Sequence, residues 1–169
     1  MIVYYVAGGS YKAFYLNNFF NLGKCDLLIF NFNILNDIEN SSLVKSSTVK
    51  EILQLSKKIK CKIIAGVNVK INKVWRKKIL ICENSKFRFY DLQKGAELKV
   101  KTKTFFINAA FKNFKANNKI IFSTNQLLPN VKACSKNKIY IFCDSMGVNY
   151  VINKNLKRNF NKCSKIILK

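Results

Sequence analysis

Two patterns alternate regularly over residues 1–69, and this alternation constrains the fold more than any other feature of the sequence. Short apolar runs rich in β-branched and aromatic residues, which are typical of buried strands, alternate with segments whose apolar residues recur at helical spacing. The predicted order is strand 1–7, helix 11–22, strand 25–30, a helix that begins near residues 46–48 and ends near 60, and strand 61–69. Strands joined by helical crossovers run parallel, so we expect an α/β fold.

The next segment departs from this alternation. Lys77–Cys82 and Lys86–Tyr90 are strand-like runs separated by only three residues, a spacing that predicts a β-hairpin. Beyond the hairpin we predict strands at 119–123, 138–143 and 165–168, a helix at 153–161, and at 94–116 a loop with a short helix or strand around 105–111. The sequence contains no linker and no internal repeat. We therefore predict one domain, residues 1–169, built on a mixed sheet.

The chain carries a large excess of positive charge. It has 31 Lys and Arg against 8 Asp and Glu, a formal net charge of +23. Such an excess favours an anionic partner, and lysines interleaved with Phe and Tyr at 86–90 and 111–115 are typical of nonspecific binding to single-stranded nucleic acid. However, A/T-rich codons supply Lys together with the Asn, Ile and Phe that are abundant here. Only three basic residues are Arg, the type that specific phosphate and base contacts favour. Both explanations stay open.

The residue types present exclude several kinds of chemistry. The chain has no His, which removes Ser-His-Asp and Cys-His catalysis and His-ligated zinc. Its six cysteines are spread singly, so we expect no metal and no cofactor, and most of these thiols should be buried. The sequence shows neither an apolar run long enough to span a membrane nor a signal peptide, and we expect a cytoplasmic protein without a membrane partner.

Cys143 is the candidate for chemistry. It ends the buried-type strand KIYIFC, and open α/β sheets place their sites at the carboxyl ends of parallel strands. An isolated cysteine in such a strand is more often a small core residue than a nucleophile. The context of the strand therefore decides between the two interpretations.

That context resembles the nitrilase superfamily, the carbon–nitrogen hydrolases. The run CDLLIFNFN corresponds to the family strand that delivers a glutamate base, the segment 49–94 follows the family's helix, strand and hairpin, and KIYIFCDS corresponds to the strand that carries the nucleophilic cysteine. NKCSKIIL is similar to the strand that follows it. The resemblance extends over residues 1–168 and implies a nitrilase-like mixed sheet with helices, truncated relative to the full αββα sandwich. It also implies Cys143 as the nucleophile and a small amide-type substrate.

The sequence departs from the family at the other catalytic positions. Asn31-Phe32 replaces Pro-Glu after the first buried strand, and the nearest acids, Asp37 and Glu39, lie several residues later. Strict placement puts Leu92 at the family's oxyanion lysine, whereas the nearest lysine, Lys94, comes two residues late, about 7 Å along a strand. The acidic residue after the cysteine is displaced as well, because Asp144 follows Cys143 directly.

Three functions therefore remain to be distinguished. The chain is a nitrilase-like hydrolase with weak or altered activity through Cys143 and Lys94, a catalytically inactive nitrilase-like fold kept for binding, or a small basic protein that binds nucleic acid or another polyanion. In the first two cases we also expect a homo-oligomer, because a sheet that lacks part of the family sandwich leaves apolar surface for a partner to cover.

Overall fold

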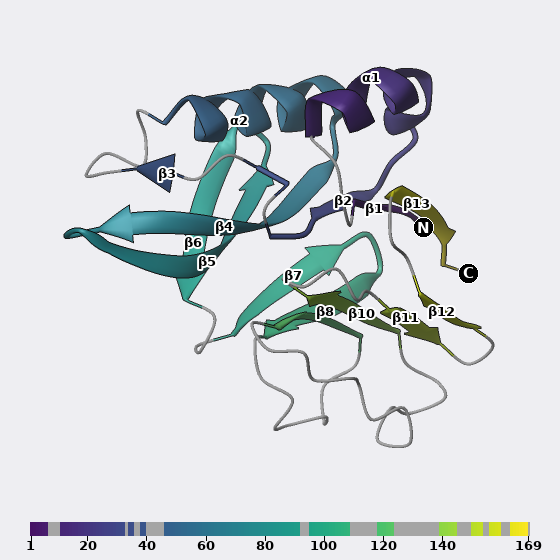
Figure 1. The fold of residues 1–169 in the computed structure, drawn as a ribbon. Coiled ribbons are helices and arrows are strands. Elements are labelled where there is room, and N and C mark those ends of the chain that lie inside the picture. The colour runs from purple at the N-terminus through teal and green to yellow at the C-terminus, as the bar shows by residue number, and fades with distance from the viewer. Residues whose placement is uncertain are drawn as a thin grey trace.

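The described part of the chain folds into two β-sheets packed face to face, with two helices on the outer face of one sheet (Figure 1). The computed structural model describes residues 1–6, 11–32, 34–35, 38–39, 46–91, 95–108, 118–123, 139–144, 150–153, 156–159 and 163–168. The arrangement confirms the α/β fold class expected from the sequence.

The first sheet is mixed and contains the alternating amino-terminal strands. Its order is β13-β1-β2-β4-β5-β6, with β3 paired to β4. The bounds are β1 Ile2–Val6, β2 Leu27–Phe30, β3 Ile38–Glu39, β4 Lys62–Ile71, β5 Val74–Glu83, β6 Lys86–Asp91 and β13 Cys163–Ile167. β1, β2 and β4 run parallel, as the helical crossovers between them require, whereas β5, β6 and β13 pair antiparallel to their neighbours.

The second sheet has the order β12-β11-β10-β9-β8-β7. The bounds are β7 Ala96–Val100, β8 Lys103–Asn108, β9 Lys119–Ser123, β10 Tyr140–Asp144, β11 Tyr150–Asn153 and β12 Leu156–Asn159. β8, β9 and β10 run parallel, and β7, β11 and β12 add antiparallel pairs at the two edges.

Two apolar cores hold these layers together. One lies between the sheets, where residues such as Ile29 and Ile64 of the first sheet meet Phe105 and Ile120 of the second. The other lies between the first sheet and the helices α1 (Tyr11–Leu22) and α2 (Ser47–Ile59). All four residues of β2 are buried because this strand has a core on both faces, which explains its unbroken apolar run.

Two segments differ from the sequence-based expectations. The predicted loop at 94–116 contains the hairpin β7–β8, and the alternately buried and exposed residues of β7 fit a strand with one face on the core. The helix predicted at 153–161 is wrong, since the described residues there belong to β11 and β12, which pair with each other. The short polar run around Leu156 has too few apolar residues to define a helical face, and pairing with β11 supplies its backbone partners instead.

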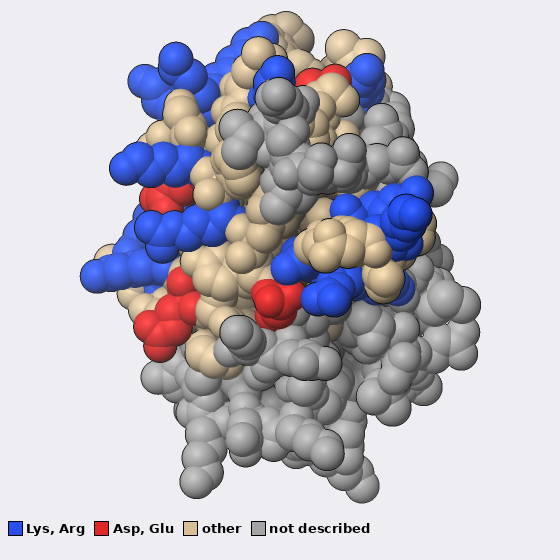
Figure 2. Space-filling model, turned by 90° about the vertical axis from the view of Figure 1, so that its left-hand side faces the viewer, with Lys and Arg blue, Asp and Glu red and all other residues tan. Residues whose placement is uncertain are grey.

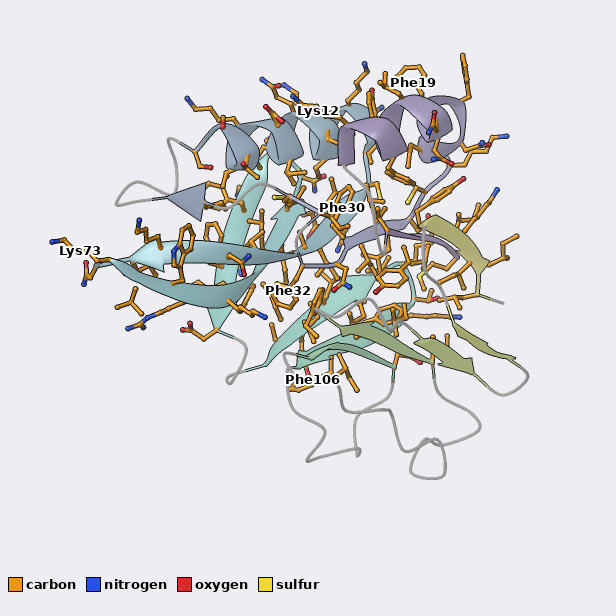
Figure 3. The ribbon with its side chains drawn as sticks, in the orientation of Figure 1. Lys12, Phe19, Phe30, Phe32, Lys73 and Phe106 are labelled. Atoms are coloured by element: carbon orange, nitrogen blue, oxygen red, sulfur yellow. The ribbon has the colours of Figure 1, made fainter. Side chains whose placement is uncertain are left out.

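β4 and β5 form a long hairpin that the sequence did not predict. Its two-residue turn, Asn72-Lys73, has both φ angles positive, at 50° and 65°. This is the geometry of the primed turns that suit the twist of hairpin strands, and Asn adopts it more readily than most residues. In Figure 1 the half of the hairpin next to its turn extends past the strands of the second sheet, and Figure 3 places Lys73 at the tip.

Candidate functional site

The carboxyl ends of β2 and of the strand pair β9–β10 meet inside the sandwich. Phe32, just after β2, contacts Phe122 of β9 edge to face, with ring centroids 5.8 Å apart and planes at 82°. The Cα of Cys143 in β10 is in register with Phe122. The fold therefore brings Phe32 next to the strand pair that carries the candidate cysteine.

Phe32, which the resemblance aligns with the family's glutamate, carries a buried phenyl ring. Phe32 is 2% exposed and belongs to the core between the sheets, where Figure 3 shows it. It lies against the backbone of β4 at Gly66, where a Cβ would come within 2.8 Å of the ring. The ammonium of Lys77 covers the ring at 5.3 Å from its centroid. An apolar ring therefore fills this place, and it can neither accept a proton nor orient a water molecule.

The preceding residue, Asn31, fixes the turn that delivers Phe32. Its side chain is 1% exposed, and its Oδ1 accepts a hydrogen bond from the Phe32 N–H at 2.8 Å. Its own N–H donates to the Val6 carbonyl at 3.0 Å. A side-chain amide is no substitute for a carboxylate base, because it does not take up a proton near neutral pH.

The other sequence-predicted residues fall into two groups. Lys94, Leu92 and Asp37 lie outside the described residues. The backbones of Glu39 and Asp144 are described: Glu39, in β3, is in register with Lys70, and Asp144, in β10, with Ser123.

Lys77 is a basic residue of this region that the sequence analysis did not select. Lys77, Ile79 and Ile81 occupy every second position of β5. The two isoleucines face the core between the sheets. This period of two places Lys77 on the same face, where it reaches Phe32. The predicted strand 77–82 already carried this alternation, but the sequence does not show which face of the strand meets the second sheet.

Three further thiols are buried away from this end of the sheet. Cys25 and Cys61 lie just before β2 and β4, and their Sγ atoms are 3.3 Å apart. The hydrogen bond from Cys61 lowers the pKa of Cys25, and the same hydrogen bond, together with burial, raises that of Cys61. Burial raises the pKa of Cys82 to about 12. These packed thiols confirm the expectation of buried cysteines at three of the six positions.

A groove of about 420 Å³ opens at the opposite edge of the two sheets, between β5, β6 and β7. Its lining mixes basic residues with Glu83 and Glu97. Lys62 forms an ion pair with Glu83 at 2.7 Å and also donates to the carbonyl of Lys99. These contacts join the two sheets at this edge, and we assign them a structural role.

Neither a metal centre nor a membrane-spanning helix is found in the described part of the chain. No three His, Cys, Asp or Glu side chains gather there in a way that could hold a metal ion. The helices described there are too short or too polar to cross a bilayer.

Comparison with known proteins supports the fold and not a particular activity. No protein-family model and no curated protein matches the sequence. Among solved structures, Nit3 of Saccharomyces cerevisiae, a member of branch 10 of the nitrilase superfamily, aligns with a TM-score of 0.70 at 10% identity. XC1258 of Xanthomonas campestris, a CN-hydrolase superfamily protein, aligns with a TM-score of 0.65 at 11% identity. Both alignments cover 98% of this chain and 89% of the other.

The NitN amidase of Nesterenkonia sp. AN1 aligns over 100% of this chain and 93% of its own, with a TM-score of 0.65 at 5% identity. Each of these three proteins belongs to the superfamily that the strand order and the Cys143 strand suggested, and each alignment extends over nearly all of this chain. The chain therefore has the fold of the nitrilase superfamily.

Proposed function

We propose that this chain is a degenerate carbon–nitrogen hydrolase domain, in which hydrolysis of amides or nitriles through the thiol of Cys143 is weak or lost. The observation that supports this most directly is the buried Phe32 at the glutamate position, packed against Phe122, the register partner of Cys143. If the resemblance assigns the glutamate position correctly, the residue at that position cannot act as the base.

The chemistry explains why this substitution matters. Hydrolysis through a thioester needs a base twice, first to form the thiolate and then to activate the water that releases the acyl group. A thiol with an ordinary pKa near 8.5 is only a few per cent ionised at neutral pH. The net charge of +23 favours the thiolate, but positive charge supplies no base for the second step. The acyl group would then leave Cys143 only slowly.

Within this proposal Cys143 is the nucleophile, and Lys94 is the basic residue nearest in sequence to the family's oxyanion position. The substrate class is a small amide. A cysteine-to-alanine mutant of the Nesterenkonia amidase, whose fold this chain shares at 6% identity and a TM-score of 0.62, was solved in complex with butyramide. The expected compartment, the cytoplasm, stays a prediction.

Ammonia release from butyramide tests the proposal, measured on the wild type and on Cys143→Ala. General base catalysis contributes about 10²–10⁴-fold, so we expect a kcat below about 0.1 s⁻¹, against about 10 s⁻¹ for a typical enzyme. A kcat above about 1 s⁻¹ that disappears in Cys143→Ala would show an intact catalytic site and overturn the proposal.

Iodoacetamide labelling of the folded protein, read by peptide mass spectrometry, tests the role of the thiol separately. A residual nucleophile predicts that Cys143 is labelled faster than Cys134 and Cys163. Equal labelling rates of the three cysteines would mean that Cys143 is not a nucleophile. The chain would then be a binding protein with this fold.

A further inference from the structure

The exposed half of the β4–β5 hairpin continues the inner face of the first sheet beyond the sandwich. Ile64, Gly66, Ile79 and Ile81 of these strands line or adjoin the core between the sheets. Two residues further along each strand, on the same face, come the cross-strand pairs Asn68–Lys77 and Lys70–Trp75. We call these four residues, together with Lys73 at the turn, the hairpin surface.

Trp75 is the aromatic centre of the hairpin surface. Its side chain remains 45% exposed although an indole is among the most costly groups to leave in water. The ammonium of Lys70 lies 5.4 Å from the ring centroid. With the Lys70 ammonium over one face of the ring, a nucleobase stacks on the other face while the phosphate of the nucleotide meets the ammonium.

The charge carried by the hairpin itself is of one sign, although Glu39 of the neighbouring strand β3 is in register with Lys70. The hairpin carries Lys70, Lys73, Arg76, Lys77 and Lys78, and the sequence contains no Asp or Glu from residue 52 to residue 82. Lys78 is paired with Asp91 at 2.8 Å, whereas Lys73, Arg76 and Lys77 are exposed. Figure 2 looks onto the end of the molecule from which the hairpin projects, and basic side chains spread widely over this face among smaller acidic areas.

We propose that the hairpin surface binds single-stranded nucleic acid, with a base stacked on Trp75 and the backbone phosphates held by Lys73 and Lys77. The indole selects nucleic acid over other polyanions, because stacking needs a base whereas lysines alone attract any anion. Single strands are favoured over duplexes because their bases are free to stack. The surface adjoins Phe32 through Lys77, so the ligand lies at the end of the sheet that carries Phe32.

The chain offers a direct probe, because Trp75 is its only tryptophan. Titration with oligo(dT) of about 15 nucleotides, with excitation selective for tryptophan, reports on the indole alone. We expect the emission to be quenched at the same concentrations at which the anisotropy of labelled oligo(dT) rises. Inorganic polyphosphate, which has the charge without the bases, should bind without that quenching, and duplex DNA should quench less than the single strand.

Two matched pairs of variants separate the surface from the general charge. Trp75→Ala should weaken oligo(dT) binding on the order of 5- to 100-fold, with Trp75→Phe in between. Ile167→Ala, on the 64% exposed Ile167 of β13, should change it less than twofold. Lys73→Gln should reduce the slope of log affinity against log salt by about 0.7. Lys12→Gln removes the same charge on α1, far from the hairpin tip in Figure 3, and should leave the slope nearly unchanged.

Each variant's circular dichroism and unfolding midpoint show whether it is folded. Trp75 and Lys73 are exposed, so both substitutions should leave the midpoint nearly unchanged. Binding of oligo(dT) without quenching, or equal affinities of Trp75→Ala and Ile167→Ala, would overturn the proposal and assign the binding to the overall charge. Quenching by polyphosphate equal to that by oligo(dT) would do the same.

Discussion

The edge-to-face contact of Phe32 with Phe122 links the end of β2 to the strand beside Cys143. Both rings are almost fully buried, and Phe32 lies directly on Gly66 of β4. The contact therefore fills the meeting point of three strands with apolar groups. In this chain the contact contributes to the stability of the sandwich.

Substitutions at Phe32 and Gly66 should have strongly coupled effects on the free energy of unfolding. Phe32→Ala leaves a cavity between the sheets and should cost about 3–5 kcal/mol of the free energy of unfolding. Gly66→Ala places a methyl group 2.8 Å from the ring and should cost about 1–3 kcal/mol. In the double variant the new methyl occupies part of the cavity, so the combined cost should be at least about 1 kcal/mol less than the sum.

Urea unfolding of the four proteins in this cycle measures the coupling. The control is Gly23→Ala, because a Cβ at Gly23 meets nothing within 4 Å, so this change should be additive with Phe32→Ala. Additive costs for Gly66→Ala and Phe32→Ala would mean that the ring does not rest on Gly66.

The sequence predicted the parts of this arrangement that depend on long apolar runs. β1, β2, β4, β10 and both helices follow from unbroken or periodic apolar patterns, and the resemblance to the family strand is what assigns Phe32 to the glutamate position. The contact with Phe122 could not be predicted, because it depends on which strands of the two sheets face each other. The second sheet was also partly missed, since frequent lysines in β7 and β8 obscure its alternation.

Asp26 should make the stability of the fold depend on acid pH. Its Oδ2 accepts the Ile2 N–H at 2.7 Å, and its Oδ1 pairs with Lys101 at 2.8 Å, which ties the first sheet to the β7–β8 turn. Partial burial opposes ionisation, but the hydrogen bonds and charge of these partners outweigh it and lower the pKa of Asp26. A lowered pKa contributes stability above the unfolded value near 3.9, and this stability is lost as the pH falls through the folded value.

We therefore expect Asp26→Asn to lose about 1–2 kcal/mol at pH 7 and to match the wild type more closely near pH 2. Urea midpoints at the two pH values measure this difference. Glu97→Gln, on the exposed side of β7, is the control and should change the midpoint little at either pH. A loss in Asp26→Asn that is as large at pH 2 as at pH 7 would assign the effect to packing instead of charge.

Cys82 should make the stability of the fold fall as the pH rises into the alkaline range. Its side chain is fully buried, and burial raises its pKa to about 12 from an ordinary value near 9. Because the folded state holds the proton more tightly, stability falls as the pH rises above the unfolded pKa, by about 1.4 kcal/mol for each unit between roughly 9 and 12. Cys82→Ala removes this dependence, so its stability should fall less than that of the wild type between pH 9 and pH 10.5.

Unfolding in urea at these two pH values gives the comparison. Ile79→Val creates a small cavity on the same strand without removing a thiol. Relative to the wild type, it should therefore lose the same free energy of unfolding at both pH values. Parallel pH profiles for the wild type and Cys82→Ala would show that the thiol ionises in the folded protein without penalty.

The exposed apolar residues of α1 should support association of the chain with itself. Leu16, Phe19 and Phe20 are 76%, 42% and 91% exposed, a patch of large side chains that monomeric proteins usually cover. We expect a homodimer at about 0.3 M salt, where screening weakens the repulsion between two chains of charge +23. Leu16→Gln combined with Phe20→Gln should shift the mass measured by light scattering to that of the monomer. Lys12→Gln changes the same helix without removing apolar surface and should leave the dimer intact, whereas a wild type that stays monomeric at micromolar concentration would contradict the prediction.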